Sequence, residues 1–593
     1  MIALHDSRNP EYRTPTGALP TGKYVTLRVH TDAERCWLRL WWDDRETLLP
    51  MRRAEDDKAL FRRRLKLPAE PGLLWYYFVL EKGGRRYCFG SPPDGLGGEG
   101  QLYDHEPPSF QITVYDPAYE TPRWMAEGVM YQIMPDRYCA VDPVEPPQGH
   151  LHKSWDEPPE HCVDEQSRDN CASDFFGGNL RGIASKLDYI SRLGVSVIYL
   201  NPIFRARSNH KYDTADYGMI DPSFGDEADF EALCRQAKEK GIRVILDGVF
   251  SHTGSDSRYF NRYGHYEDIG AYQSKDSPYA DWYTFNHWPD DYACWWGFDS
   301  LPNVKEMNPG YLDYIVTGKD PIVRRWMRRG ASGWRLDVAD ELPMPFIREV
   351  RRAVKAQDPD AALIGEVWED ASRKITYGEL RCYCLGDTLD SVMNYPLREG
   401  LIDFMNGQIT APELKRRLDS LYECYPPPFA RSLMNLVGSH DKARVISRLS
   451  GEEPEHRRPE DRDCVPLTPE GYARGRERFI KIWRFLCALP GMPCLYYGDE
   501  AGLQGGDDPF CRGTYPWGHE DAGLIEAIRE INLQRRKSRA AQWGDLNLTA
   551  NGDDSITARR TFKGETLEVT LCRRDGDIQP SGQENKTEHS GNA

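Results

Sequence analysis

Eight short apolar segments, each followed by a helix-like stretch, recur between residues 129 and 500 of this chain. The segments are VMYQIMPDRY (129–138), VSVIYLNPIF (195–204), RVILDGVF (243–250), GWRLDVA (333–339), ALIGEVW (362–368), LDSVMNYP (389–396), SLMNLVGSHD (432–441) and MPCLYYGDE (492–500). Amphipathic stretches such as LRGIASKLDYISRLG and DEADFEALCRQAKEKG lie between them. Nearly continuous apolar strands that alternate with helices are typical of a parallel sheet buried on both faces. Eight such units predict an α/β fold of the (β/α)8 TIM-barrel type.

The regions outside the predicted barrel show a different pattern of apolar and polar residues. Residues 1–112 contain KYVTLRVH, CWLRLWW and LLWYYFVLE between polar turns, which predicts an N-terminal β-sandwich. We place the barrel at 123–525, with an inserted subdomain at 253–303 after the third strand, because so long a connection is usually functional. SITARRTF and TLEVTLCRR predict a short C-terminal β domain at 526–574. The polar residues 575–593 are expected to be disordered.

The composition indicates the kind of ligand. A formal net charge of −17 repels phosphate backbones and anionic lipids, so we expect neither nucleic acid nor membrane as a partner. Aromatic residues make up 11 % of the chain, with 16 Trp, and flat rings are suited to stacking on sugars. A neutral small ligand fits this balance best.

The sequence also predicts a cytoplasmic protein. The opening MIALHDSRNPEYRTPTG has no apolar leader segment, and no apolar run approaches the roughly 18 residues of a membrane span. The 15 cysteines are scattered without framework spacing, which suits a reducing compartment.

Polar residues occur where the predicted strands end. Because the loops at the carboxyl ends of barrel strands carry the active site, these residues are candidates for catalysis and binding. They are Asp247 and His252 after the third strand, Arg335 and Asp337 at the fourth, Glu366 and Trp368 at the fifth, His440 and Asp441 at the seventh, and Asp499 and Glu500 at the eighth.

Two carboxylates among them suggest acid–base chemistry. Arg335 and Asp337 are two residues apart on a strand and share one face, and the guanidinium should favour an ionised Asp337. Glu366 follows Ile364 in an apolar segment that should favour its protonated form. Two carboxyl groups in different environments are the arrangement that glycoside hydrolysis uses.

Plainer interpretations exist for each residue taken alone. A buried Asp beside an Arg is more often a structural ion pair than a catalyst, a lone histidine is more often a satisfied core residue, and tryptophans such as Trp295, Trp296 and Trp368 are more often core aromatics. The favoured interpretation depends on their coincidence at one end of successive strands. A zinc site is not expected at His150, His152, His161, Cys162 and Cys171, whose spacing matches no regular zinc motif.

At this level of detail the chain resembles the α-amylase family, glycoside hydrolase family 13, and most closely its neopullulanase, cyclomaltodextrinase and maltogenic amylase group. Four short family segments appear in order as DGVFSH, GWRLDVADE, GEVWE and VGSHD. FFGGNLRGIASKLDYISRLGVSVIYLNPIF and SNHKYDTADYGMIDPSFG resemble the group over longer stretches, and the N-terminal sandwich resembles its starch-binding-type module.

The resemblance implies a role for each candidate residue. Asp337 is implied as the nucleophile, Glu366 as the general acid and base, and Asp441 as the group that stabilises the transition state. The resemblance implies that the remaining candidates bind the substrate or orient the acids: Tyr212, Asp247, His252, Arg335, Trp368, His440, Asp508 and Arg512. Retaining hydrolysis of this kind needs no cofactor.

Several positions depart from the family pattern. Ser251 and Asn179 stand where the family usually has Asn and Asp, and the loop around Asp142 lacks most of the group's calcium ligands. We therefore expect no metal, because Ca²⁺ needs several oxygen ligands. Asp340 and Lys442 stand where Asn and Thr are commoner, next to the predicted site of cleavage.

The resulting hypothesis is an intracellular hydrolase of α-1,4-glucosidic bonds, with α-1,6 bonds also considered. Its substrates would be maltooligosaccharides, cyclodextrins, pullulan or starch. The alternatives are a transglycosylase, including a sucrose- or trehalose-directed enzyme of the same superfamily, a catalytically inactive glucan-binding protein, and a metal-dependent barrel hydrolase. In the resembling group the N-terminal domain of one subunit often walls the partner's cleft, so a homodimer is included in the hypothesis.

Overall fold

The computed structural model describes residues 1–145, 150–160, 172–452 and 466–574. Its central sheet has eight parallel strands in the order β26-β23-β22-β19-β16-β13-β28-β27, and a parallel bridge between Met393 and Met434 closes it into a barrel. The strands are β13 (Met130–Ile133), β16 (Val197–Leu200), β19 (Arg243–Gly248), β22 (Gly333–Leu336), β23 (Ala362–Gly365), β26 (Ser391–Val392), β27 (Met434–Leu436) and β28 (Met492–Tyr496). The predicted (β/α)8 barrel is confirmed.

Successive residues of each barrel strand point alternately to two cores. The interior core contains Met130, Val197, Ile245 and Met434 together with residues at the same phase of the other strands. The intervening residues, such as Ile198, pack against the surrounding helices. Towards the carboxyl ends, the inward positions change from apolar to polar. They are occupied there by Gln132, Tyr199, Asp247, Arg335 and Glu366.

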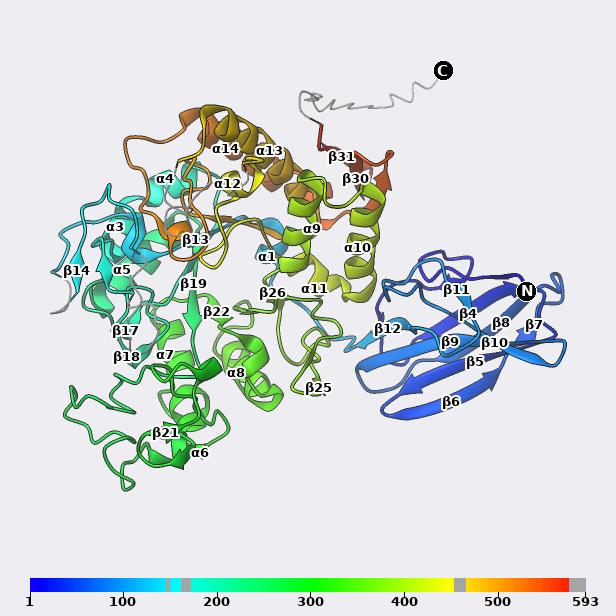
Figure 1. The fold of residues 1–593 in the computed structure, drawn as a ribbon, viewed down its shortest axis with the longest axis horizontal. Helices are drawn as coiled ribbons and strands as arrows, with labels where there is room; N and C mark the ends of the chain where they lie inside the picture. The colour runs from blue at the N-terminus through cyan, green and yellow to red at the C-terminus, as the bar shows by residue number, and fades with distance from the viewer. Residues whose placement is uncertain (146–149, 161–171, 453–465, 575–593) are drawn as a thin grey trace, which may run out of the picture.

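Helices surround the barrel (Figure 1). Helix α5 shows why they form, since Asp226 and Asp229 make a capping box at its start and Phe230, Leu233 and Ala237 form its buried face. The α-helices of the barrel region are α1 (Arg123–Glu127), α2 (Pro135–Tyr138), α3 (Leu180–Ser185), α4 (Leu187–Arg192), α5 (Glu227–Glu239), α6 (Pro309–Leu312), α7 (Ile322–Arg328), α8 (Met344–Gln357), α9 (Tyr395–Met405), α10 (Ala411–Cys424), α11 (Pro427–Ser432), α12 (Val445–Leu449), α13 (Pro469–Ala488), α14 (Ala522–Lys537) and α15 (Arg539–Trp543).

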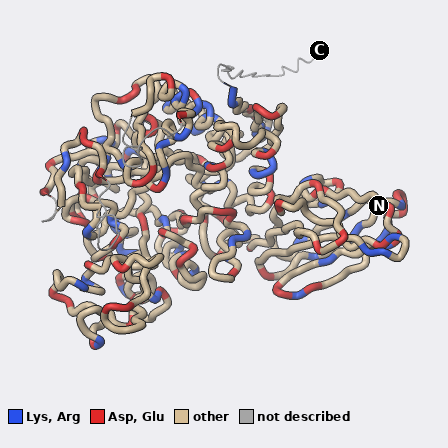
Figure 2. Tube along the Cα trace, in the orientation of Figure 1, with Lys and Arg blue, Asp and Glu red and all other residues tan. Residues whose placement is uncertain are grey.

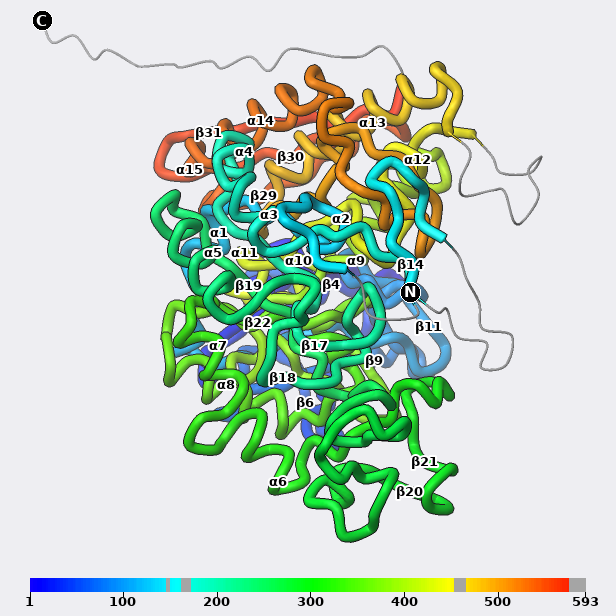
Figure 3. The backbone as a smooth tube through the Cα atoms, turned by 90° about the vertical axis from the view of Figure 1, so that its left-hand side faces the viewer, coloured from blue at the N-terminus to red at the C-terminus, as the bar shows by residue number. Residues whose placement is uncertain are grey.

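A separate lobe follows β19. It contains the turns η1 (Ala280–Trp282) and η2 (Trp295–Gly297) and the strands β20 (Phe285–His287) and β21 (Asp291–Tyr292). Phe260 contacts the rings of Tyr283, Phe285 and Tyr292. These residues are continuous with the helix-facing core of the barrel. Figures 1 and 3 show β21 and α6 at one end of the molecule and α13 and α14 at the opposite end.

The N-terminal region is a sandwich of two sheets, as predicted. One sheet contains β1 (Ala3–Leu4), β2 (Arg13–Thr14), β4 (Tyr24–Thr31), β7 (Arg52–Arg53) and β8 (Leu60–Lys66). The other contains β3 (Leu19–Pro20), β5 (Arg35–Trp42), β6 (Arg45–Pro50), β9 (Gly72–Lys82), β10 (Arg85–Gly90), β11 (Gln101–Tyr103) and β12 (Phe110–Tyr115). Alternating residues of both sheets, including Val25, Leu27, Leu38 and Phe78, form the core between them.

The sandwich is attached to the barrel by polar contacts. Arg8 and Arg13 donate to the two carboxylate oxygens of Glu423 on α10, at 2.8 and 3.1 Å. Acidic and basic residues are interspersed over both regions in Figure 2. The contacts of Arg8 and Arg13 with Glu423 place the sandwich beside the barrel, close to α10 (Figure 1).

The C-terminal region is an antiparallel sheet of β29 (Asp545–Ala550), β30 (Ser555–Phe562) and β31 (Glu565–Cys572). Its buried residues Leu548, Ile556 and Leu571 join the helix-facing core of the barrel. The tail at 575–593, predicted to be disordered, lies outside the described residues. None of the described helices is both long enough and apolar enough to cross a bilayer.

Candidate active site

Arg335 lies at the centre of a group of buried acids at the carboxyl ends of the barrel strands. Its Nη1 atom donates to Oδ1 of Asp247 at 2.8 Å and to Oδ1 of Asp337 at 2.7 Å. Its Nη2 atom lies 2.8 Å from Oε2 of Glu366. All four residues are buried. One guanidinium group therefore holds three carboxyl groups that come from three neighbouring strands or their ends.

Strand register produces this arrangement. Asp247 of β19 stands opposite Arg335 of β22, which in turn stands opposite Ile364 of β23. Ile364 faces the barrel interior, so Glu366, two residues later, emerges on the same side. Leu336 packs instead in the helix-facing core. The predicted shared face of Arg335 and Asp337 is confirmed.

The surroundings of Glu366 differ from the apolar setting that the sequence suggested. Besides the contact with Arg335, its carboxylate accepts hydrogen bonds from the backbone N–H of Val338 at 2.9 Å and from the indole N–H of Trp368 at 3.0 Å. Val338 follows the end of the neighbouring strand β22. The hydrophobic pattern of the sequence does not predict that its N–H reaches Glu366. Glu366 therefore has one positive and two polar neighbours.

Burial is the largest influence on the carboxyl group of Asp337. It raises the pKa of Asp337 well above the ordinary value of 3.8, the charge of Arg335 lowers it, and the charges of Glu366 and Asp247 raise it again. The net direction is upward, whereas the sequence suggested that Arg335 would dominate. The physical reason is that Arg335 is shared among three carboxyl groups, so it only partly compensates each of them.

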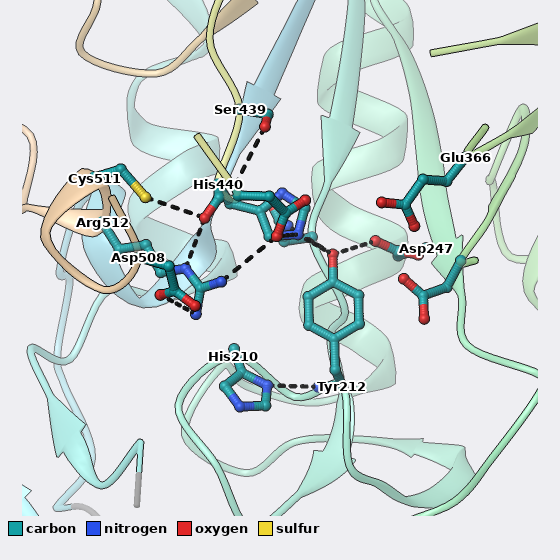
Figure 4. A network of polar contacts seen from close by, with 12 residues as sticks. His210, Tyr212, Asp247, Glu366, Ser439, His440, Asp508, Cys511 and Arg512 are labelled. Atoms are coloured by element: carbon teal, nitrogen blue, oxygen red, sulfur yellow. Dashed lines mark hydrogen bonds and ion pairs between the residues drawn. The ribbon is translucent and has the colours of Figure 1, made fainter. Parts of the chain in front are cut away.

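A hydrogen-bonded chain connects Tyr212 to the same group (Figure 4). The Tyr212 hydroxyl donates to Oδ2 of Asp247 at 2.9 Å and lies 2.6 Å from Nε2 of His440. Nε2 of Gln132 lies 2.8 Å from Nδ1 of His440, and burial lowers the pKa of His440 well below its usual value. A neutral His440 that accepts from Gln132 carries its proton on Nε2 and donates it to Tyr212. The chain therefore fixes the orientation of the Tyr212 ring.

Asp441 is within reach of both His440 and Arg512, and Figure 4 shows those two residues with Asp508. Its Oδ1 atom is 3.3 Å from Nε2 of His440 and 3.7 Å from Nη2 of Arg512. Arg512 is itself fixed, because it contacts Asp508 at 2.9 Å and donates to the main-chain carbonyl of His440 at 2.9 Å. The Asp441 side chain is 26 % exposed, compared with 9 % for Asp337. Asp441 thus presents an open face that a ligand can reach.

His252 and Trp368 lie at the edges of the site. Nε2 of His252 lies 3.1 Å from the main-chain oxygen of Tyr212, and burial lowers the pKa of His252 to about 4. Trp368 is 40 % exposed and stacks on Tyr395 with ring centroids 4.4 Å apart. The structure brings every residue to which the resemblance assigns a role into one connected cluster.

Several members of this cluster were not predicted. Tyr199 donates to Asp247 at 2.6 Å, Asn201 donates to the Tyr212 hydroxyl at 3.0 Å, and His210 accepts from the backbone N–H of Tyr212 at 3.1 Å. Gln132, which contacts His440, was not predicted either. A signal for Gln132 and Tyr199 exists in the sequence, since they are polar or amphipathic residues at inward positions of apolar strands.

The acids of the eighth strand lie outside the cluster. Asp499 pairs with Arg444 at 3.0 Å. Glu500 is buried and accepts hydrogen bonds from Tyr131 at 2.6 Å and Tyr189 at 3.0 Å, in the layer between barrel and helices. Grouping Asp499 and Glu500 with the active-site residues was therefore wrong, because position at a strand end does not determine which side the chain turns to.

The positions considered for calcium are occupied by protein hydrogen bonds. The Asn179 side chain caps α3 by accepting from Gly182 at 2.8 Å, and it donates to the carbonyl of Val141 at 2.7 Å. The Ser251 hydroxyl lies 3.0 Å from Nδ1 of His252. These side chains do not fit a calcium ligand set. In the part of the chain that the structure describes, no three His, Cys, Asp or Glu residues form a metal-ligand group. Of the histidines and cysteines considered for zinc, His161, Cys162 and Cys171 lie outside the described residues.

Comparison with known proteins extends this picture. The family model described as "Alpha amylase, catalytic domain" matches residues 132–552. The amylopullulanase of Thermoanaerobacterium saccharolyticum is 39 % identical over 95 % of this chain and 46 % of its own length. The chain therefore spans less than half of that relative.

A shorter relative and a solved structure match over most of their lengths. The cyclomaltodextrinase of Geobacillus thermopakistaniensis is 32 % identical over 88 % of this chain and 82 % of its own. The structure of the cyclic alpha-maltosyl-(1→6)-maltose hydrolase from Arthrobacter globiformis matches with a TM-score of 0.64 and 32 % identity, over 76 % of this chain and 92 % of that one. Because the family match covers well over half of the chain, the chain belongs to the alpha-amylase family of glycoside hydrolases.

Proposed function

We propose that this protein hydrolyses α-1,4- and α-1,6-glucosidic bonds in maltooligosaccharides, cyclodextrins, pullulan or starch, with retention of anomeric configuration. The observation that carries the proposal is the contact of one guanidinium group, that of Arg335, with both Asp337 and Glu366. Retaining enzymes use two carboxyl groups about 5 to 5.5 Å apart, and two acids held by the two terminal nitrogens of one arginine fit that separation.

The proposed reaction has two displacements. Asp337 attacks the anomeric carbon while Glu366 gives its proton to the departing glycosidic oxygen, so the C–O bond to the leaving sugar breaks as the bond to Asp337 forms. Glu366, now ionised, takes a proton from water, and the resulting hydroxide displaces Asp337 from the sugar. The hydrogen bonds from Val338 and Trp368 hold Glu366 in one orientation through both steps.

The other residues are proposed to bind the sugar. Asp441, with its open face, would bind ring hydroxyls and stabilise the charge that develops on the anomeric centre. Tyr212 would stack beneath the same ring, and Trp368 would contact the sugar on the leaving-group side. His252, His440, Asp508 and Arg512 complete the predicted binding set. Both oxygens of Asp247 are engaged by protein donors, so its contacts favour a role in holding Arg335 and Tyr212.

Relatives supply the proposed substrate class. Their names describe amylopullulanases, a neopullulanase, cyclomaltodextrinases and a hydrolase of cyclic maltosyl-maltose, all acting on α-glucans. A transglycosylase remains the alternative, because a sugar hydroxyl in place of water would complete the same second step. The gathering of Asp337, Glu366 and Asp441 in one site argues against an inactive glucan-binding protein.

We further propose a cytoplasmic homodimer in which the sandwich of one subunit walls the partner's cleft. The scattered 15 cysteines support the compartment. The resemblance to a group in which one subunit's N-terminal domain often walls the partner's cleft supports the assembly. Gel filtration with light scattering tests the assembly, and a monomer at micromolar concentration would contradict it.

Release of reducing sugar from soluble starch tests the proposed function. The wild-type protein should release it, and Asp337→Asn should lose activity by roughly 10³-fold or more while it keeps the wild-type circular dichroism spectrum. Wild-type-like activity in Asp337→Asn would remove Asp337 from its proposed role.

A further inference from the structure

Two exposed aromatic side chains are held by one carboxylate next to the proposed active site. Oε1 of Glu341 accepts from the indole N–H of Trp296 at 3.2 Å and from the Tyr377 hydroxyl at 2.8 Å. Trp296 belongs to the lobe that follows β19, and Tyr377 lies on a hairpin beyond β23. Glu341 therefore joins two loops that are about eighty residues apart in sequence.

Both rings are largely exposed. Trp296 is 75 % exposed and Tyr377 is 72 % exposed, which is unusual for side chains of this size. Both residues also have left-handed backbones, with φ of 50° at Trp296 and 52° at Tyr377, which costs energy for residues with a Cβ. A conformation that is strained and exposes apolar surface is not explained by packing, so a binding role is the better explanation.

The hairpin is anchored at its base by the neighbouring acid. Its strands are β24 (Ile375–Thr376) and β25 (Glu379–Leu380). Asp340 accepts from the Tyr383 hydroxyl at 2.6 Å and lies 3.3 Å from Nζ of Lys374, so it holds both ends of the hairpin. Arg381 also donates to the main-chain carbonyl of Asp340 at 3.1 Å. Asp340 and Glu341 thus fix the base and the tip of one hairpin.

A line of rings connects the pair to the proposed active site. His252, whose Nε2 contacts the backbone of Tyr212, has its ring 5.8 Å from that of Trp295. Trp295 stacks on Trp296, with centroids 5.3 Å apart and planes at 19°. The two exposed rings therefore continue an aromatic surface that begins at the site.

We propose that Trp296 and Tyr377 form an outer sugar-binding platform, on which a further glucose residue of a bound α-glucan chain stacks. Flat faces with hydrogen-bonding edges suit the apolar face of a pyranose ring and its hydroxyl rim. Glu341 is the positioning residue that keeps the rings in place, and Asp340 fixes the hairpin that carries Tyr377. The α-glucan identity of the ligand rests on the proposed function.

The test compares chain lengths in single variants. For Tyr377→Ala and Trp296→Ala, kcat/KM should fall about tenfold more for maltoheptaose than for maltotriose, mainly through KM, because one stacking contact of the longer chain is lost. Tyr377→Phe and Glu341→Gln should show the same preference to a smaller extent, since the ring stays but its tether is weakened. Tyr263→Ala, which removes a half-exposed tyrosine of the lobe that follows β19, serves as the matched control.

The outcomes separate the platform from the catalytic proposal. Equal losses on both substrates, or no loss on either, would overturn the platform. If the wild-type protein cleaved no glucan, the proposed function would fail by itself. The platform would then be judged by calorimetric titration with maltoheptaose: weaker binding to Tyr377→Ala than to Tyr263→Ala supports it, and equal or undetectable binding refutes it.

Discussion

Nη1 of Arg335 lies 2.7 Å from Oδ1 of Asp337, while Nη2 of the same side chain lies 2.8 Å from Glu366. Arg335 is fully buried and also holds Asp247. A single positive charge thus serves three carboxyl groups that have little access to water. The stability of the barrel end and the protonation of the proposed nucleophile both depend on this guanidinium.

Removing the charge of Arg335 should destabilise the protein. Arg335→Leu leaves Asp247, Asp337 and Glu366 buried without a counter-charge, and breaking such a group typically costs about 3 to 5 kcal/mol. Urea unfolding at pH 7, followed by circular dichroism, measures the loss. Arg335→Lys, which keeps a charge but makes fewer contacts, should lie between Arg335→Leu and wild type. A free energy of unfolding for Arg335→Leu equal to that of wild type would show that the cluster does not need the charge.

The pH at which kcat/KM falls on the acid side of its profile (the acid limb) should be higher than the pKa of an ordinary aspartate. Asp337 must be ionised to attack, and burial raises its pKa above 3.8, so kcat/KM should fall as the pH drops through that raised value. Arg335→Lys should move the limb to still higher pH, because it weakens the contact of the positive guanidinium with Asp337. A pH profile of kcat/KM on a maltooligosaccharide tests both statements. An acid limb near pH 3.8 in both proteins is the contrary result.

Glu500 should make stability depend on pH near neutrality. Burial raises its pKa from 4.5 to about 7, so the folded state binds the proton more tightly than the unfolded state. The stabilisation is fully present below pH 4.5 and is lost as the pH rises through about 7, at a slope of about 1.4 kcal/mol per pH unit between these values.

Glu500→Gln keeps an acceptor for Tyr131 and Tyr189 and removes the titration. Its free energy of unfolding should therefore decrease less than that of wild type between pH 5 and pH 8. Glu526→Gln, at a partly exposed position on α14, is the control and should follow wild type. Parallel curves for Glu500→Gln and wild type would mean that Glu500 does not bind the proton in this range.

The sequence was sufficient for those features that follow from periodicity. The two-residue spacing of Arg335 and Asp337 on a strand placed them on one face, and the apolar segments located all eight barrel strands. Contacts made across strands and between loops were not accessible in this way. Glu366 accepts a hydrogen bond from the backbone N–H of Val338 because the ends of two neighbouring strands lie close together. The local pattern of apolar and polar residues does not predict that contact.

Asp340 is another residue whose contacts could not be predicted from the sequence. Its departure from the family pattern was visible in the sequence and suggested an altered sugar subsite. The structure shows that it holds the hairpin through Tyr383 and Lys374, whose pairing with Asp340 depends on how two loops fold together. Glu500 is a second example, since a strand-end acid that seemed part of the site turns towards Tyr131 and Tyr189 instead.

The central claim is a double displacement at Asp337, and the anomeric configuration of the first product tests it most directly. Proton NMR during the first minutes of maltooligosaccharide hydrolysis distinguishes the two anomers before mutarotation mixes them. Retention predicts that the signal of the α-anomer grows first and that the β-anomer follows only as mutarotation proceeds. Initial formation of the β-anomer would show a single displacement by water and would contradict the assignment of Asp337 as nucleophile.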